Sequence, residues 1–306
     1  MDIDKGLKKK IKEAISVKVK DIKGVLALAE EKDIPPKIKG NFYLVECTND
    51  EVREADFLDV LENYVLHYCL KHSEYTTVNS TNAVAIVKKA IRKFVRSEHS
   101  GELGELVLFC LLESQINAVQ LLNKMQLKTN PNMHFHGADA VHFGVTGKLK
   151  TLYLGESKMQ SAFSTALTNA LGSVKTLFEN MAEKKKFEVD LIEPHLDHAK
   201  LRGMEQEILN YLNPYKKKRD FCEVIAVFIG YSWKELAEAE KKDVKGGILK
   251  YLMEKYREEI VRFVKTVDEK VKAEQSVCSK RFLFFVVPFK NVQQIKTDFK
   301  EKLKRV

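Results

Sequence analysis

The chain has 306 residues, of which 44% are hydrophobic, so it can bury a substantial core in one large domain or two modest ones. Lysine and arginine together exceed aspartate and glutamate by nine, which favours a polyanionic partner such as nucleic acid. The most apolar runs, 224–230 and 282–288, are far shorter than the roughly 20 residues that span a bilayer, so we expect no membrane partner.

Two further absences in the sequence narrow the class of protein. The five cysteines are widely spread and form no CxxC pair, which favours a reducing, cytoplasmic location and argues against a zinc ribbon. There is no glycine-rich phosphate loop, so we expect neither an ATPase nor a small-molecule cofactor.

The first third of the chain predicts mainly helices. Its first thirty residues are rich in lysine and have roughly helical spacing, and 42–47 predicts a short strand. Helices are expected over 56–72 and 83–96. The second of these has a basic polar side: Lys88, Lys89, Arg92, Lys93 and Arg96. We therefore interpret residues 1–96 as a mainly helical N-terminal region that could bind a partner.

Residues 97–306 predict an α/β domain in which strands alternate with helices. Strands are expected at 137–144, 149–158, 222–230 and 281–287, and helices at 101–113, 163–181, 233–242, 247–273 and 291–304. This alternation is typical of a mixed sheet flanked by helices.

Three residues of this domain form a pattern that suits phosphodiester chemistry: Asp139 on one expected strand, and Glu156 and Lys158 on the next. Side chains two apart on a strand point the same way. If the turn at 146–147 leaves a loop with an even number of residues, Asp139 pairs with Leu154 or Glu156 and shares their face. Two such carboxylates suit Mg²⁺ or Mn²⁺, and the lysine can hold or activate a water.

The Glu-x-Lys pattern alone is uninformative in so charged a chain. It recurs at Glu30–Lys32, Glu183–Lys185 and Glu240–Lys242, where the polar surroundings indicate solvated helical faces. The copy at Glu156 differs because it ends an apolar strand, follows Gly155, has an aspartate on the preceding strand and leads into a helix.

The segments Gly101–Glu105, Gly137–Asp139 and Leu154–Lys158, in this order, resemble the restriction-endonuclease-like (PD-(D/E)xK) nucleases. More closely, they resemble the HamA family of bacterial Hachiman antiphage defence systems. The similarity covers about 98–182 and extends more weakly over the whole chain. It implies a PD-(D/E)xK core with a mixed sheet, and a metal-dependent deoxyribonuclease.

The resemblance also implies roles for individual residues. Asp139 and Glu156 would hold Mg²⁺ (or Mn²⁺), and Lys158 would be the catalytic lysine. A glutamate of the first core helix would complete the acidic set. Glu105 is preferred because it directly precedes the apolar run, whereas Glu102 could serve the helix dipole instead, a role that also remains open for Glu105.

By the same resemblance, the partners are DNA and a helicase subunit, HamB, that would keep the nuclease quiet until it senses abnormal DNA. The alternative is a non-catalytic DNA-binding or regulatory subunit that retains the nuclease fold. Three histidines near the acidic residues, His134, His136 and His142, indicate a polar strand edge or a DNA contact rather than zinc, since no further ligands lie at suitable spacing.

Overall fold

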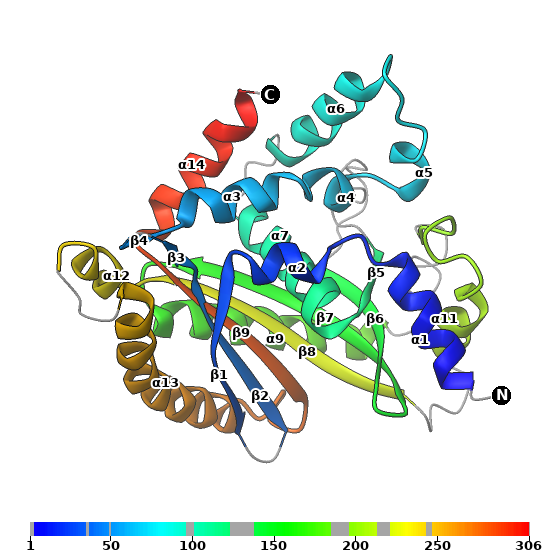
Figure 1. The fold of residues 1–306 in the computed structure, drawn as a ribbon. Coiled ribbons are helices and arrows are strands. Elements are labelled where there is room, and N and C mark those ends of the chain that lie inside the picture. Colours follow the sequence, from blue (N-terminus) through cyan, green and yellow to red (C-terminus); the bar gives the residue numbers. More distant parts are fainter. Residues whose placement is uncertain are drawn as a thin grey trace.

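A mixed seven-stranded sheet organises the chain (Figure 1). The computed structural model describes residues 3–34, 37–48, 50–95, 101–122, 138–184, 196–212, 221–242 and 247–305. In sheet order the strands are β1 (Leu26–Ile34), β2 (Ile38–Val45), β9 (Arg281–Phe289), β8 (Phe221–Ser232), β7 (Leu149–Gln160), β6 (Ala140–Thr146) and β5 (Val119–Leu122). The β2, β9, β8 and β7 strands are parallel to one another, and the outer pairings are antiparallel. The predicted mixed α/β architecture is therefore confirmed.

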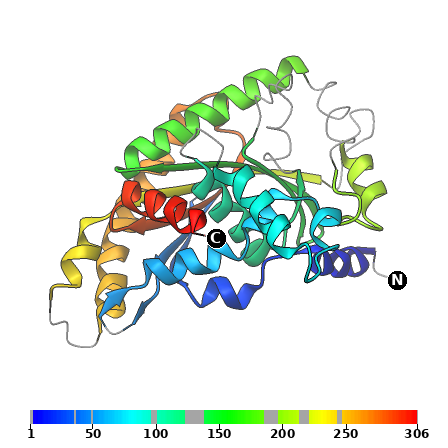
Figure 2. The same ribbon diagram turned by 90° about the horizontal axis from the view of Figure 1, so that it is seen from above.

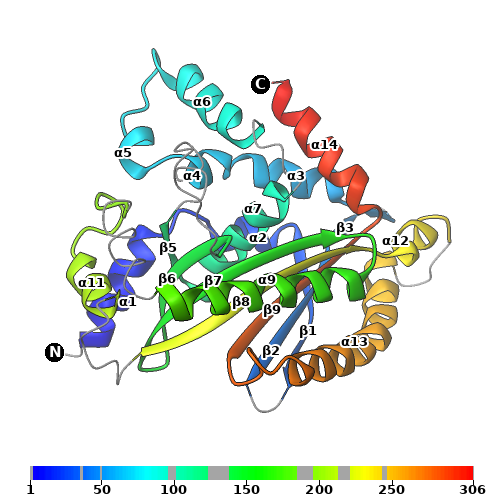
Figure 3. The same ribbon diagram turned by 180° about the vertical axis from the view of Figure 1, so that it is seen from behind.

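Helices cover both faces of the sheet, and a two-stranded ribbon, β3 (Cys47–Thr48) with β4 (Glu51–Val52), lies beside it. The helices are α1 (Ile3–Ala14), α2 (Val19–Lys23), α3 (Glu54–Glu62), α4 (Val65–Cys69), α5 (His72–Tyr75), α6 (Ala83–Val95), α7 (Glu102–Leu111), α9 (Phe163–Lys184), α11 (Glu205–Leu212), α12 (Lys234–Ala239), α13 (Ile248–Ala273) and α14 (Val292–Lys304). Figure 2 shows α9 on one side of the sheet and α3 on the other. Figure 3, the view from behind, shows α9 lying across the strands. No helix in the described parts of the chain is long and apolar enough to cross a bilayer.

The N-terminal region departs from the predicted helical pattern at residues 26–30, which belong to strand β1. A bulge between Leu28 and Glu30 explains the mistake. The extra residue lets Leu26 and Ala29 face the core although they are three apart, a spacing that imitates a helix. The helix expected over 56–72 is likewise three short ones, α3, α4 and α5.

The remaining predicted elements of the C-terminal part are confirmed within a few residues, and in the segments that the structure describes two elements were missed. These are the edge strand β5 and the helix α11. Strands β1 and β2 pair with β9, so the predicted regions 1–96 and 97–306 contribute to one sheet and share one hydrophobic core.

A buried ion pair joins three parts of the chain that are distant in sequence. Lys200 Nζ lies 2.7 Å from Glu113 Oε1, and the two side chains are 4% and 0% exposed. The other carboxylate oxygen accepts the backbone N–H groups of Ser16, at 2.7 Å, and Val17, at 3.1 Å. Glu113 lies in a short π-helical segment, Leu112–Ile116, directly after α7. Its carboxylate thus ties the N-terminal segment and the segment before α11 to the core.

We expect Lys200→Met to lower the free energy of unfolding by roughly 3–5 kcal/mol, because it leaves the Glu113 carboxylate buried beside no cation. Chemical denaturation at neutral pH measures the change. The matched control is Lys265→Met, which removes a lysine from a surface pair with Glu269 that is 79% and 64% exposed, and should cost at most about 1 kcal/mol. Equal losses in the two variants would contradict the role of the buried pair.

Candidate active site

The β6–β7 hairpin has a two-residue loop, because Thr146 pairs with Leu149. The first loop residue, Gly147, has a φ of +63°, which glycine adopts without strain. The loop therefore has the even length that the sequence argument required for Asp139 to share a face with Glu156 and Lys158.

At the other end of the hairpin, the last pair of the β6–β7 ladder is Ala140 with Gly155. Asp139, which precedes Ala140, therefore lies opposite Glu156, which follows Gly155. The Asp139 backbone N–H donates to the Gly155 carbonyl oxygen at 2.7 Å. In return, the Ser157 N–H donates to Asp139 Oδ2 at 2.9 Å. These two hydrogen bonds hold the aspartate carboxylate beside the strand that carries the glutamate and the lysine.

Glu156 and Lys158 form an ion pair, with 2.6 Å between Lys158 Nζ and Glu156 Oε1. The glutamate side chain is 9% exposed and the lysine 27%, so the lysine reaches solvent while the carboxylate does not. Burial raises the pKa of Glu156 to about 7, and the nearby charge of Asp139 adds to the rise. Lys158 and a hydrogen bond to Ser173 of α9 act in the opposite direction. The two carboxylates therefore repel each other in a partly desolvated site.

Helix α7 packs against the opposite face of β7, and two glycines permit its close approach. A Cβ on Gly155 would lie 2.7 Å from Ala140 Cβ and 2.9 Å from Leu108 Cδ2 of α7. A Cβ on Gly104 would lie 3.0 Å from Ser157 Oγ. Glycine at these positions brings the first turn of α7 beside the end of β7, where the acidic residues lie.

Both helix glutamates of the prediction are buried at this contact. Glu105 Oε2 accepts a hydrogen bond from the Tyr68 hydroxyl at 2.7 Å. Burial, then Glu105, and more weakly Asp139 raise the pKa of Tyr68, so this hydroxyl lies in the field of both carboxylates. Glu102 acts instead on Lys296 of α14, whose Nζ donates to the Met159 carbonyl oxygen at 2.8 Å. The choice of Glu105 over Glu102 stays a prediction.

Sequence reasoning missed Tyr68 and Lys296 as neighbours of the site. Tyr68 fits the apolar spacing of the segment 56–72 and was interpreted only as a core residue. Lys296 is one of many lysines in the C-terminal segment, and nothing in the sequence singles it out. Only the packing of α4 and α14 against α7 and β7 reveals them.

The residues present fit a magnesium ion held by two carboxylates. Among the described residues, no three His, Cys, Asp or Glu side chains are grouped so that they could hold a metal. However, Mg²⁺ commonly binds through one or two carboxylates and keeps several waters. Burial and, after it, repulsion from Asp139 raise the pKa of Glu156, and a divalent cation between the two carboxylates would relieve that repulsion. Asp139 and Glu156 are thus the residues that would hold the ion.

Of the three histidines for which the sequence predicted a polar strand edge or a DNA contact, the structure describes only His142. His134 and His136 lie outside the described residues. His142 is completely buried within β6 and packs beside the Phe109 ring, at 6.0 Å between ring centroids. The expectation that it forms a polar strand edge or a DNA contact is wrong, since its ring is enclosed between the sheet and α7.

The other Glu-x-Lys copies show what distinguishes the one at Glu156. Glu30 and Lys32 lie on strand β1, not on a helix as predicted, and they form an ion pair of the same 2.6 Å length. Phe42 pairs with Glu30 on the neighbouring strand, so no second carboxylate faces them there. The Glu240 and Lys242 side chains bind other partners, and Lys185 lies outside the described residues.

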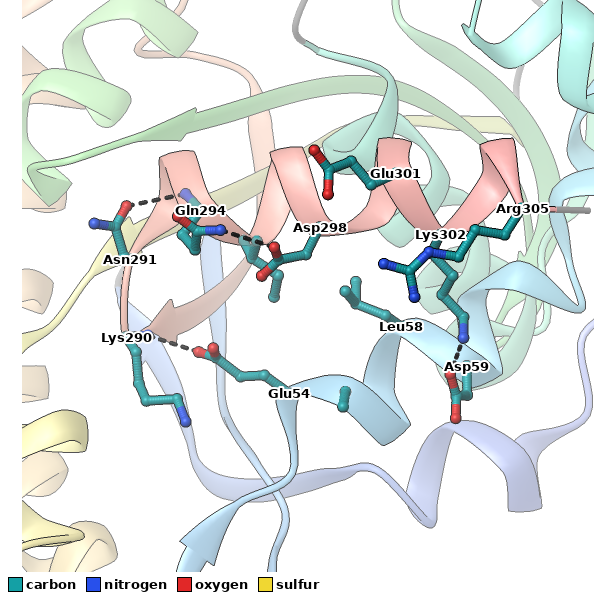
Figure 4. A pocket seen from close by; sticks show the side chains of 12 residues that line it. Glu54, Leu58, Asp59, Lys290, Asn291, Gln294, Asp298, Glu301, Lys302 and Arg305 are labelled. Atoms are coloured by element: carbon teal, nitrogen blue, oxygen red, sulfur yellow. Dashed lines mark hydrogen bonds and ion pairs between the residues drawn. The ribbon is translucent and has the colours of Figure 1, made fainter.

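A cavity of about 510 Å³ opens between α3 and α14 (Figure 4). It is lined by Glu54, Ala55, Leu58, Asp59, Lys290, Asn291, Gln294, Ile295, Asp298, Glu301, Lys302 and Arg305. None of the residues predicted for the active site lines this cavity. Its mixture of acidic and basic groups is a separate feature of the surface.

Fold and site together define an α/β protein with a mixed sheet that carries an Asp–Glu–Lys cluster at the end of its β6–β7 hairpin. The family model for HamA matches residues 19–303, and the chain belongs to the HamA family. The resemblance seen in the sequence is thereby confirmed, and membership suggests a role in Hachiman defence. No curated protein matches the chain in sequence.

Gly155→Ala should lower the free energy of unfolding by about 1–3 kcal/mol, because the new methyl group would collide with Ala140 and Leu108. Gly172→Ala in α9 is the matched control, since a methyl group on that glycine would meet no atom within 4 Å. The control should be neutral or stabilising by up to about 1 kcal/mol. Denaturation curves measure both changes, and an unchanged Gly155→Ala protein would contradict the tight contact.

In metal-free buffer, the free energy of unfolding should fall as pH rises from about 4.5 to about 7. In this window folded Glu156 keeps a proton that the unfolded chain releases, so the unfolded state is favoured by up to roughly 3 kcal/mol. Glu156→Gln should flatten this decline, measured by denaturation in EDTA. The exposed strand residue Glu223 provides the control, Glu223→Gln, which should keep the wild-type profile. A wild-type slope in Glu156→Gln would count against the shifted carboxyl.

Proposed function

We propose that this chain is the nuclease effector of a Hachiman system and hydrolyses DNA phosphodiester bonds in a metal-dependent reaction. One observation carries the proposal: Asp139, Glu156 and Lys158 meet at the end of one hairpin, with the glutamate buried and the lysine reaching solvent. The order of these residues and the mixed sheet between helices support a PD-(D/E)xK core. Membership of the HamA family supports the defence role.

The chemistry follows from what each side chain can do. Asp139 and Glu156 would hold Mg²⁺ (or Mn²⁺), which when bound polarises the scissile phosphate and acidifies a coordinated water. Lys158 lies within ion-pair distance of Glu156 and reaches solvent, so its ammonium can position a water or balance negative charge on the phosphate. Glu105, held by the Tyr68 hydroxyl, is the preferred additional carboxylate.

The substrate and the partner are supported by charge and by family. The net charge of +9 favours a polyanion, and Lys88, Lys89 and Arg92 of α6 are exposed. DNA is the polyanion that an antiphage nuclease would meet. A HamB-like helicase is the expected partner, and residues 1–96 together with the C-terminal helices are the surfaces proposed for that contact.

The test is plasmid cleavage with Mg²⁺ or Mn²⁺, by wild type and by Glu156→Ala/Lys158→Ala, with and without the co-purified helicase and ATP. We expect cleavage to need the metal and to fall at least about 100-fold in the double variant, since both a metal ligand and the lysine are lost. The matched control is Glu30→Ala/Lys32→Ala, which removes the same Glu-x-Lys ion pair from the edge strand β1 and should leave cleavage unchanged.

A non-catalytic DNA-binding subunit is the second candidate. It is favoured by one observation: Lys158 already supplies a counter-charge to Glu156, in an ion pair of 2.6 Å. For that protein, Glu156→Ala/Lys158→Ala and wild type would bind DNA equally and cut it in none of the conditions. Equal behaviour of this kind would overturn the nuclease proposal.

A further inference from the structure

The last helix, α14, carries three lysines spaced four residues apart: Lys296, Lys300 and Lys304. Residues at this spacing lie one above another on a helix, about 6 Å apart along its axis. We call them the α14 lysine row. Lys296 is buried, Lys300 is half-buried and Lys304 is exposed, so the row runs from the interior to the surface.

The inner end of the row touches the candidate active site. Lys296 Nζ donates to the carbonyl oxygen of Met159, the residue that follows Lys158. Burial lowers the pKa of Lys296, the charge of Lys300 lowers it further, and Glu102 opposes both effects. The innermost lysine thus lies between the strand that carries the site and one of the glutamates predicted for it.

The two outer lysines of the row, Lys300 and Lys304, form no ion pair with a described residue. Lys302 of the same helix differs, since it points toward α3, where it pairs with Asp59 (Figure 4). It also pairs with Glu62 of the same helix α3. Like charges four apart on a helix repel each other. A polyanion laid along the row would remove this repulsion.

We propose that the α14 lysine row binds the phosphate backbone of nucleic acid beside the candidate active site. Because Lys296 is buried, the contacts with phosphate would come from Lys300 and Lys304. These two lysines are about 6 Å apart along the helix axis, and one strand of B-DNA advances about 3.4 Å per nucleotide, so they would follow roughly two nucleotides. Contacts from lysines to phosphates position a strand without reading its sequence. The inference rests on the proposed function and deepens it by naming the surface that would hold the substrate.

The test measures binding of a fluorescent DNA duplex to the full chain in EDTA, where metal-dependent cleavage cannot occur, over a range of salt concentrations. Lys300→Ala/Lys304→Ala should bind more weakly at low salt, and its plot of log K against log salt should be shallower by about two. Wild type should therefore lose roughly tenfold more affinity than this variant between about 50 and about 200 mM salt.

The matched control, Lys290→Ala/Lys302→Ala, removes the same charge from two lysines that already have acidic partners, and should keep the wild-type slope. Lys290 pairs with Glu240, which follows α12, and Lys302 pairs with Asp59 of α3. The charge-preserving Lys300→Arg/Lys304→Arg should also keep it, which separates lost charge from a damaged helix. A wild-type slope in the row variant, an equal loss in the control, or no binding by wild type at low salt would overturn the proposal.

Failure of the lysine-row proposal and failure of the proposed nuclease function give different results. Binding that depends on the row, in a protein that never cuts plasmid, would remove the nuclease assignment and leave the row in place. Metal-dependent cutting with unchanged binding by Lys300→Ala/Lys304→Ala would remove the row and leave the nuclease assignment in place.

Discussion

The pairing of β7 with both of its neighbours is the constraint on which the candidate site depends. Eleven residue pairs align β7 with β8 in parallel, and seven align it with β6 in the antiparallel sense. Because side chains alternate along a strand, a slip of one residue would turn Glu156 and Lys158 toward α7 and bring Ser157 to their place. The hairpin loop and the two ladders exclude that slip. Gly155 also excludes it, because a side chain at this position would collide with Leu108 of α7.

Charge is distributed unevenly around this framework. Where charges are buried and structural, as for Glu113 and Lys200, each has a close counter-charge, and the Glu113 carboxylate also accepts two backbone hydrogen bonds. At the candidate site, Lys158 pairs with Glu156 while the charge of Asp139 lies nearby, and the glutamate retains a raised pKa. Excess charge of this kind costs stability and is typical of functional sites, where a ligand completes the balance. The same contrast separates Lys302, which has acidic partners, from Lys300 and Lys304.

The sheet also explains how the two predicted regions relate. Residues 26–45 contribute two strands to the sheet: β2 continues its parallel part beside β9, and β1 pairs with β2 in the antiparallel sense. The N-terminal region is therefore part of the same sheet as the core. Glu113 adds a second attachment through the backbone of Ser16 and Val17. A partner that binds the N-terminal helices would therefore contact elements that are packed directly against the sheet.

By itself, the sequence determined the α/β class, most of the C-terminal elements and the shared face of Glu156 and Lys158. These features depend on local periodicity and on the alternation of side chains along a strand, and both can be recognised in short segments of the sequence. The sequence placed Asp139 on that face only on condition of an even-numbered hairpin loop, and the structure shows such a loop, of two residues. Only the tertiary structure showed that 26–30 is a strand, because a β-bulge gives its buried residues a spacing of three, which resembles that of a helix. Only it decided that Tyr68 and Lys296 adjoin the site. Contacts between segments far apart in sequence depend on how the helices pack and which side chains they bury, and local sequence patterns do not predict this.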